Sequence, residues 1–129
     1  MIRSLFRDGQ RKSVSAGAVR ILYRVVESSQ LPVGVRVQAG VAAPGGVRGV
    51  RRNLVRRRLM EAYRQVGHGT LLESVGRLLG STEALTLVLV DRRRANAAEI
   101  DFRRLQSDIL EAIQKIETAI SDSANESLS

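Results

Sequence analysis

The sequence predicts an α+β fold: a single compact domain in which helices pack on a small mixed sheet. The chain of 129 residues is long enough for one hydrophobic core, and 43% of its residues are apolar. Strand-like and helix-like periods of apolar residues follow one another in mixed order, with a long connection between strands. Because aromatic residues make up only 3% of the chain, Val, Leu, Ile and Ala must fill the core.

The chain begins with a short predicted helix. Ile2, Leu5 and Phe6 have the spacing of one helical face, and Gly9 permits a left-handed exit from the helix. Residues 10–17 are polar and basic, and we interpret them as a connection.

Two predicted strands follow this connection. Residues 19–26 alternate, with Val19, Ile21, Tyr23 and Val25 on one face and Arg20 and Arg24 on the other. Residues 33–41 also alternate, with Arg36 on the polar face. Since the two strands share this pattern and a short turn separates them, we expect an antiparallel hairpin.

A basic helix over residues 48–66 is the most unusual feature of the chain. Seven of the 17 residues from Arg48 to Arg64 are Arg. At about 100° per residue, Val55, Leu59 and Ala62 share one face, so the helix can dock on a core while it presents guanidinium groups elsewhere. Like charges four residues apart each destabilise a helix by roughly 0.2–0.5 kcal/mol. Phosphate groups would relieve this repulsion, because guanidinium matches their oxygens two at a time.

A second helix and a third strand are predicted next. Residues 70–79 have helical spacing, and Thr70 with Glu73 resembles a capping box. Residues 85–90 are an unbroken apolar run, typical of a central strand that is buried on both faces.

The last predicted helix begins after a second capping box, Asn96 with Glu99. Its apolar stripe runs from Phe102 to Ile120. We therefore expect the domain to span residues 1–120. The polar residues 121–129 predict a disordered tail.

Charge and composition indicate the class of partner. The formal net charge is +8, which favours nucleic acid or an acidic surface as partner. Cysteine is absent, which excludes disulfides and thiolate metal sites. We see no transmembrane run and no signal-peptide region, so we expect a cytoplasmic protein.

The predicted RNA-binding surface combines the basic helix, the polar strand face and the exit of the third strand. Its candidate residues are Arg48, Arg51, Arg52, Asn53, Arg56, Arg57, Arg58, Arg64, Arg20, Arg24, Arg36 and Arg92. Phe6 and Tyr23 are candidates for stacking on bases if they are exposed at a cleft. Core packing is the alternative for both residues, and strand alternation favours it for Tyr23.

The residues give no sign of a protein active site. His68 is the only histidine, and we interpret it as a loop residue. The carboxylates form no recognisable acid–base pair or metal cluster. Pro44-Gly45-Gly46 precedes a helix but lacks the lysine and the spacing of a phosphate-binding loop. We therefore expect no catalytic residues and no protein-bound metal.

The ordered motifs resemble the bacterial ribonuclease P protein component. The segment RRNLVRRRLMEAYR is similar to the basic helix of that family, with matches at Val50, Arg52, Asn53, Val55, Arg56, Arg57, Leu59, Glu61 and Tyr63. Upstream, LFRDGQR and ILYRV resemble the family's first helix and first strand. Downstream, LTLVLVDRR resembles its last strand. The match covers most of residues 2–118.

The resemblance implies a fold and a role. The family's fold has the order αβββαβα with a left-handed βαβ crossover, as in the second domain of ribosomal protein S5. The family's protein assists a catalytic RNA that removes the 5′ leader of precursor tRNA with Mg²⁺ bound mainly by the RNA. The implied partners are this RNA and precursor tRNA, without membrane or DNA. By position, Phe6 and Tyr23 resemble the aromatic residues of the family's leader cleft.

Two departures from the family pattern stand out. Leu54 replaces the second arginine of the family's Arg-Asn-Arg, and Pro44-Gly45 lies where the family has lysines. The alternative function is binding of another structured RNA, as in ribosomal proteins or RNA chaperones. A helix that reads the DNA major groove is disfavoured because only Asn53 is a typical base-reading residue. A membrane-surface helix is disfavoured because the apolar stripe lacks interfacial Trp and Phe.

Overall fold

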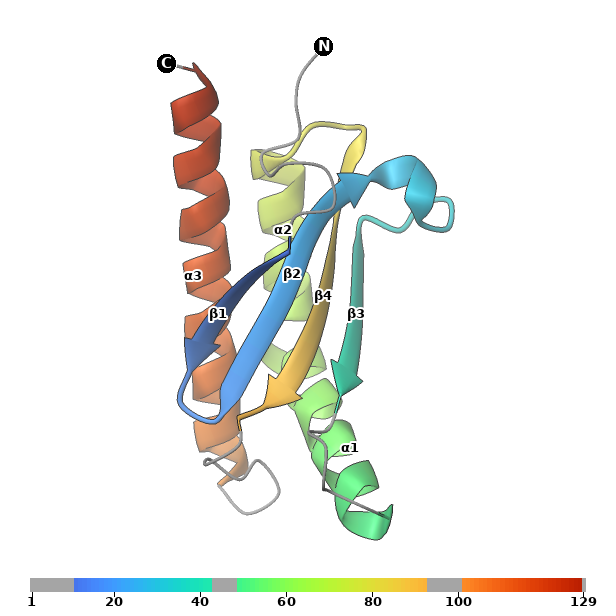
Figure 1. Cartoon of the computed structure of the whole chain (residues 1–129), viewed down its shortest axis with the longest axis vertical. Helices are drawn as coiled ribbons and strands as arrows, with labels where there is room; N and C mark the ends of the chain where they lie inside the picture. The colour runs from blue at the N-terminus through green and yellow to red at the C-terminus, as the bar shows by residue number, and fades with distance from the viewer. Residues whose placement is uncertain (1–10, 43–48, 93–100, 129) are drawn as a thin grey trace.

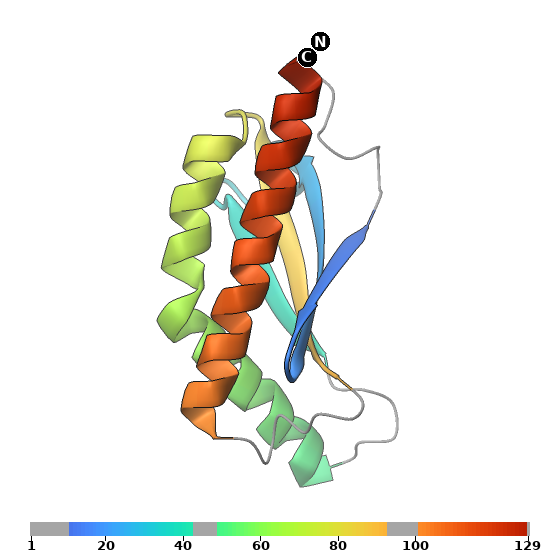
Figure 2. The same cartoon turned by 90° about the vertical axis from the view of Figure 1, so that its left-hand side faces the viewer.

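The computed structural model describes residues 11–42, 49–92 and 101–128, with the backbone alone for residues 49–52 and 124–128. In this part of the chain, one four-stranded sheet is covered on one face by helices (Figures 1 and 2). The α+β prediction is therefore confirmed. The predicted helix at Ile2 to Phe6 and the capping box of Asn96 and Glu99 lie outside the described residues.

The sheet is mixed. Its strands are β1 (Lys12–Ala16), β2 (Val19–Glu27), β3 (Val37–Ala42) and β4 (Glu83–Asp91), and a short 3-10 helix, η1 (Ser28–Gln30), follows β2. The order across the sheet is β1-β2-β4-β3. β2 pairs antiparallel with both β1 and β4, whereas β3 pairs parallel with β4.

The structure corrects two expectations about the strands. Residues 12–16 form β1, although the sequence suggested a connection there, and their alternation is short and polar. The predicted antiparallel hairpin between residues 19–26 and 33–41 is also wrong, because β4 lies between β2 and β3. Each residue of β4 from Leu85 to Val90 pairs with both neighbours. Local alternation predicts a strand, but it does not choose the strand's partner.

The connection from β3 to β4 has the less common hand. In Figure 1 both strands run downward, β3 lies to the right of β4, and the connecting helices lie behind the sheet. A chain that passes from β3 behind the sheet to β4 in this way makes a left-handed crossover. Nearly all βαβ connections are right-handed. The hand agrees with the fold that the resemblance implies.

Three helices form the second layer: α1 (Gly49–Val66), α2 (His68–Leu78) and α3 (Phe102–Leu128). α2 begins two residues before the predicted Thr70, and its N-cap is Gly67 without a side-chain cap. Thr70 instead lies in the first turn, where its Oγ1 donates to the Val66 carbonyl oxygen at 3.4 Å. The predicted capping box at Thr70 and Glu73 is therefore wrong.

The core lies between the helices and one face of the sheet. The predicted stripe of α1 is confirmed, since Val55, Leu59 and Ala62 are at most 1% exposed. α3 contributes Leu105, Ile109, Ile113, Ile116 and Ile120 to the same hydrophobic cluster. The strands contribute alternate residues, among them Ile21, Leu87 and Leu89.

The other face of the sheet is not covered by any described helix. Val88, in the middle of the central strand β4, is 37% exposed, and Thr86 and Val90 on the same face are partly exposed. The expectation that this strand is buried on both faces is therefore wrong. β4 is central in its hydrogen bonding, yet it is buried on one face only.

The C-terminal segment also differs from the prediction. α3 continues to Leu128, through most of the residues that predicted a disordered tail from residue 121. Ile120 is 2% exposed and is anchored in the core. A helix that is already docked adds one hydrogen bond for each further residue, so it extends more easily than an isolated segment of the same sequence.

Candidate nucleic-acid interface

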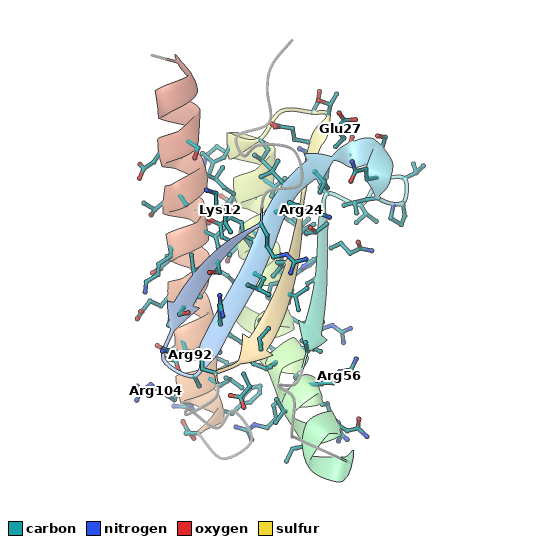
Figure 3. All side chains as sticks on the ribbon, viewed as in Figure 1. Lys12, Arg24, Glu27, Arg56, Arg92 and Arg104 are labelled. Carbon is teal, nitrogen blue, oxygen red and sulfur yellow. The ribbon has the colours of Figure 1, made fainter. Side chains whose placement is uncertain are left out.

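The exposed side of α1 presents a row of basic residues. We define the arginine face as Asn53, Arg56, Arg57 and Arg64, all of which are exposed. Val55 and Leu59 on the opposite side are buried against the sheet and α3, because one amphipathic period places the two sets on different faces. In Figure 3, Arg56 projects beyond the C-terminal end of β3.

The arginine face has little neutralising charge within the protein. In the described part of the chain, ion pairs join Arg104 to Asp108 at 3.3 Å and Lys115 to Glu111 at 3.7 Å, and both lie within α3. Neither Arg56 nor Arg57 has an ion pair or hydrogen bond with another described residue. α1 has no acidic residue in its first turn, so the positive end of its dipole adds to this charge. The arrangement favours an anionic partner.

Three further candidates on or before this helix are only partly placed. Arg51 and Arg52 lie in the first turn of α1, where the structure gives the backbone alone. Arg48 lies outside the described residues, as does Phe6. They remain sequence-based predictions.

A second candidate surface is the uncovered face of the sheet. We define the open sheet face by Arg20, Leu22, Arg24, Thr86, Val88 and Val90, which alternate with core residues along β2 and β4. It contains a hollow of about 280 Å³ whose lining includes Arg11, Leu22, Arg24, Val88 and Val90. Guanidinium groups therefore border an aliphatic floor.

Sequence reasoning found part of this hollow and missed the rest. It placed Arg20 and Arg24 on the polar face of β2, as the structure does. It also placed Leu22 on that face, but it missed Val88 and Val90 because it took residues 85–90 as buried on both faces, and it assigned Arg11 to a connection. The signal that could have found them is the pairing of Leu22 with Val88 and of Arg24 with Thr86, which depends on strand register.

Tyr23 does not line the open sheet face with its side chain. It lies in the hydrophobic cluster between the sheet and the helices and is 3% exposed. Burial raises the pKa of the Tyr23 hydroxyl above its ordinary value. The structure thus favours core packing over the role of leader-cleft aromatic.

Besides Arg20, whose Nη2 donates to Ser13 Oγ at 3.5 Å, three predicted RNA-binding arginines make contacts within the protein. Arg36 Nε donates to the Glu83 carbonyl oxygen at 3.1 Å, and its Nη2 donates to the Gly80 carbonyl oxygen at 3.0 Å, which ties β3 to the loop before β4. Arg92 Nη1 donates to the Gly17 carbonyl oxygen at 3.2 Å. The Arg58 guanidinium carbon lies 5.6 Å from the Phe102 ring centroid. These three residues are not part of the arginine face.

His68 has a definite role that the sequence did not suggest. It begins α2 rather than lying in a loop, and its Nδ1 is 2.8 Å from the Tyr63 hydroxyl oxygen. Tyr63 is 1% exposed, and desolvation raises the pKa of its hydroxyl strongly. This pair fixes the junction between α1 and α2.

Two other findings concern the described residues only. They contain no group of three or more His, Asp or Glu side chains that could hold a metal ion. None of the helices they form is both long and hydrophobic enough to span a lipid bilayer.

Solved structures of one family share the fold of this chain. The ribonuclease P protein from Thermotoga maritima matches with a TM-score of 0.55 and 15% identity, over 82% of this chain and 84% of that chain. The same protein in complex with 1-(4-fluorophenyl)-2-thiourea matches with a TM-score of 0.54 and 15% identity, over 82% and 86%. No protein-family model and no curated protein matches the sequence. The chain has the fold of the bacterial ribonuclease P protein.

Proposed function

We propose that this chain is the protein subunit of ribonuclease P, which binds a catalytic RNA and the 5′ leader of precursor tRNA. The observation that carries the proposal is the arginine face, whose Arg56 and Arg57 are exposed and unpaired within the described part of the chain. It lies on a fold shared with a ribonuclease P protein. In this role the chain would bind RNA and so assist the endonucleolytic 5′ maturation of tRNA.

The arginine face suits the phosphate backbone of a folded RNA. Its three arginines repel one another in the isolated protein, and phosphate oxygens would replace this repulsion with charge-assisted hydrogen bonds. Arg57 and Arg64 lie two turns apart, about 10 Å along the helix axis. One helix can therefore contact several phosphates in succession.

The open sheet face suits a single strand. The floor formed by Leu22, Val88 and Val90 offers apolar contact to bases, while Arg20 and Arg24 can hold phosphates or stack on a base. In the described part of this face no side chain is aromatic. Binding here would therefore depend on phosphate contacts and would discriminate weakly between bases.

The proposal assigns the bond cleavage to the RNA. Mg²⁺ held mainly by the RNA would lower the pKa of a bound water and stabilise the leaving oxygen. This chain would contribute affinity and the position of the leader.

The direct test is leader cleavage by the reconstituted complex. Purified protein is mixed with the catalytic RNA of its own genome and a precursor tRNA at low Mg²⁺, and the rate of 5′ cleavage is measured. We expect the wild type to raise the rate and the double variant R56A/R57A to raise it much less. The control R77A removes one exposed arginine from α2 and should behave like the wild type. An unchanged rate with the wild type would overturn the proposal.

One observation favours a second candidate, binding to another structured RNA. Leu54 lies on α1 with 37% of its surface exposed, at the position of an arginine in the ribonuclease P family. Because leucine carries no charge, the phosphate contact that an arginine would make at this position would be weakened. Sequencing the RNA that co-purifies with the tagged protein separates the two functions, since ribosomal RNA in place of the catalytic RNA would support this second candidate.

A further inference from the structure

Arg58 differs from the two arginines directly before it in α1. Arg56 and Arg57 are exposed, whereas Arg58 is only partly exposed and its guanidinium carbon lies 5.6 Å from the Phe102 ring centroid. This separation is within the range of a cation–π contact, which arginine makes more often than lysine. At about 100° per residue, Arg58 lies beside the buried stripe, on the side of α1 that faces α3.

The contact joins two helices at a defined place. Phe102 is the first residue of α3 and packs against the hydrophobic core. Gln65 lies on α1 seven residues after Arg58, and its Oε1 accepts a hydrogen bond from Gln106 Nε2 of α3 at 2.7 Å. Arg58 and Gln65 lie on the same side of α1, so two contacts about two helical turns apart fix the rotation of α1 about its own axis.

The rotation of α1 decides where the arginine face points. Asn53, Arg56 and Arg57 lie on the same two turns as Arg58 but project from other sides of the helix. A helix is rigid over this length, so any rotation permitted at Arg58 turns these three side chains by the same angle. After such a rotation, these side chains would no longer be aligned with the same set of phosphates.

We propose that Arg58 is a positioning residue: through Phe102 it fixes the rotation of α1 and thereby the direction of the arginine face, without contacting phosphate itself. This inference rests on the proposed function, because it concerns the same RNA-binding helix. The inference also changes the role of Arg58, because the sequence alone predicts that Arg58 contacts RNA directly.

The first test needs no RNA. The variants R58M, F102L and the double variant R58M/F102L are unfolded in urea, and the equilibrium constants for unfolding are compared. We expect the two single changes to be non-additive by about two- to fivefold, the size of a partly exposed cation–π contact. Purely additive effects would show that the two side chains are not coupled and would overturn the proposal.

The second test measures RNA affinity at several salt concentrations for R58M, F102L and R56M. We expect R58M and F102L to weaken binding about two- to fivefold with an unchanged salt slope. R56M should instead lower the slope by about 0.7–0.9, as the loss of one phosphate contact does. A lower slope for R58M would identify a phosphate contact and overturn the positioning role.

The two tests separate the inference from the proposed function. Failure of the wild type to bind the catalytic RNA would overturn the proposed function and, with it, the RNA role of Arg58. Normal wild-type binding combined with additive stability effects would overturn the positioning role alone.

Discussion

At the scale of single residues, the turn between β1 and β2 depends on one glycine and one carboxylate. Gly17 has φ +52°, a left-handed conformation, and a Cβ at this position would overlap the Asp108 carboxylate of α3. Asp108 is 7% exposed, and its Oδ2 accepts a hydrogen bond from the Ala18 N–H at 3.0 Å. The turn and the helix therefore hold each other in place.

We expect G17A to destabilise the protein by about 2 kcal/mol or more, because backbone strain and the overlap with Asp108 add together. The matched control is G34A, since Gly34 has φ +85° but nothing lies within 4 Å of its Cβ position. G34A should show only the cost of the strained backbone. Urea unfolding measures both, and equal losses would contradict the role of the Asp108 contact.

The Tyr63 hydroxyl predicts a dependence of stability on alkaline pH. Burial raises the pKa of this hydroxyl above its unfolded value of about 10. The unfolded chain therefore loses the proton first, and stability that is fully present below pH 10 falls as the pH rises further, by about 1.4 kcal/mol per pH unit. Y63F should remove this part of the decline. Unfolding measured at pH 8 and pH 11 checks it, and identical declines in both proteins would refute the assignment.

At the scale of elements, α1 shows how well a helical period predicts burial. The sequence placed Val55, Leu59 and Ala62 on the core side, and all three are buried. It placed Asn53, Arg57 and Arg64 on the opposite side, and all three are exposed. The period succeeds here because the two sides of a helix meet different environments whatever the helix packs against.

We expect L59A to cost about 2–5 kcal/mol of stability, since Leu59 is 0% exposed and its removal leaves a cavity. The control L72A makes the same change on α2, where Leu72 is 42% exposed. That variant should lie within about 0.5 kcal/mol of the wild type. Thermal or urea unfolding distinguishes the two, and similar losses would mean that α1 does not dock through its apolar stripe.

At the scale of the whole molecule, two candidate surfaces lie on different layers. The open sheet face belongs to the strands, and the arginine face belongs to a helix that covers the other side of the sheet (Figure 2). Under the proposed function, this arrangement would let the protein hold two nucleic-acid segments at once. Since the surfaces share no described contact, changes in one should add to changes in the other.

We expect R56A to lower the salt slope of binding to the catalytic RNA by about 0.7–0.9, because one phosphate contact is lost. R77A removes the same charge from an exposed position on α2 and should leave the slope unchanged. Binding is measured by titration at several salt concentrations. A slope that stays constant in R56A would remove this residue from the interface.

The elements whose signal is local could be predicted from the order of the amino acids alone. The apolar periods of α1, β2 and α3 placed their residues correctly, and the arginine face followed from α1 alone. Residues 12–16 were missed because a short polar edge strand carries little apolar alternation. α3 is longer than predicted, because a docked helix can extend beyond its apolar stripe.

Long-range packing set the features that depend on a distant partner in the chain. It put β4 between β2 and β3, set the left-handed crossover and left one face of the sheet open. It also turned Arg36, Arg58 and Arg92 toward contacts within the protein, while Arg56 and Arg57 stayed exposed. A local period of apolar residues predicts which side of a helix or strand is apolar. Only long-range packing selects which element lies against that side, and hence which arginines remain exposed.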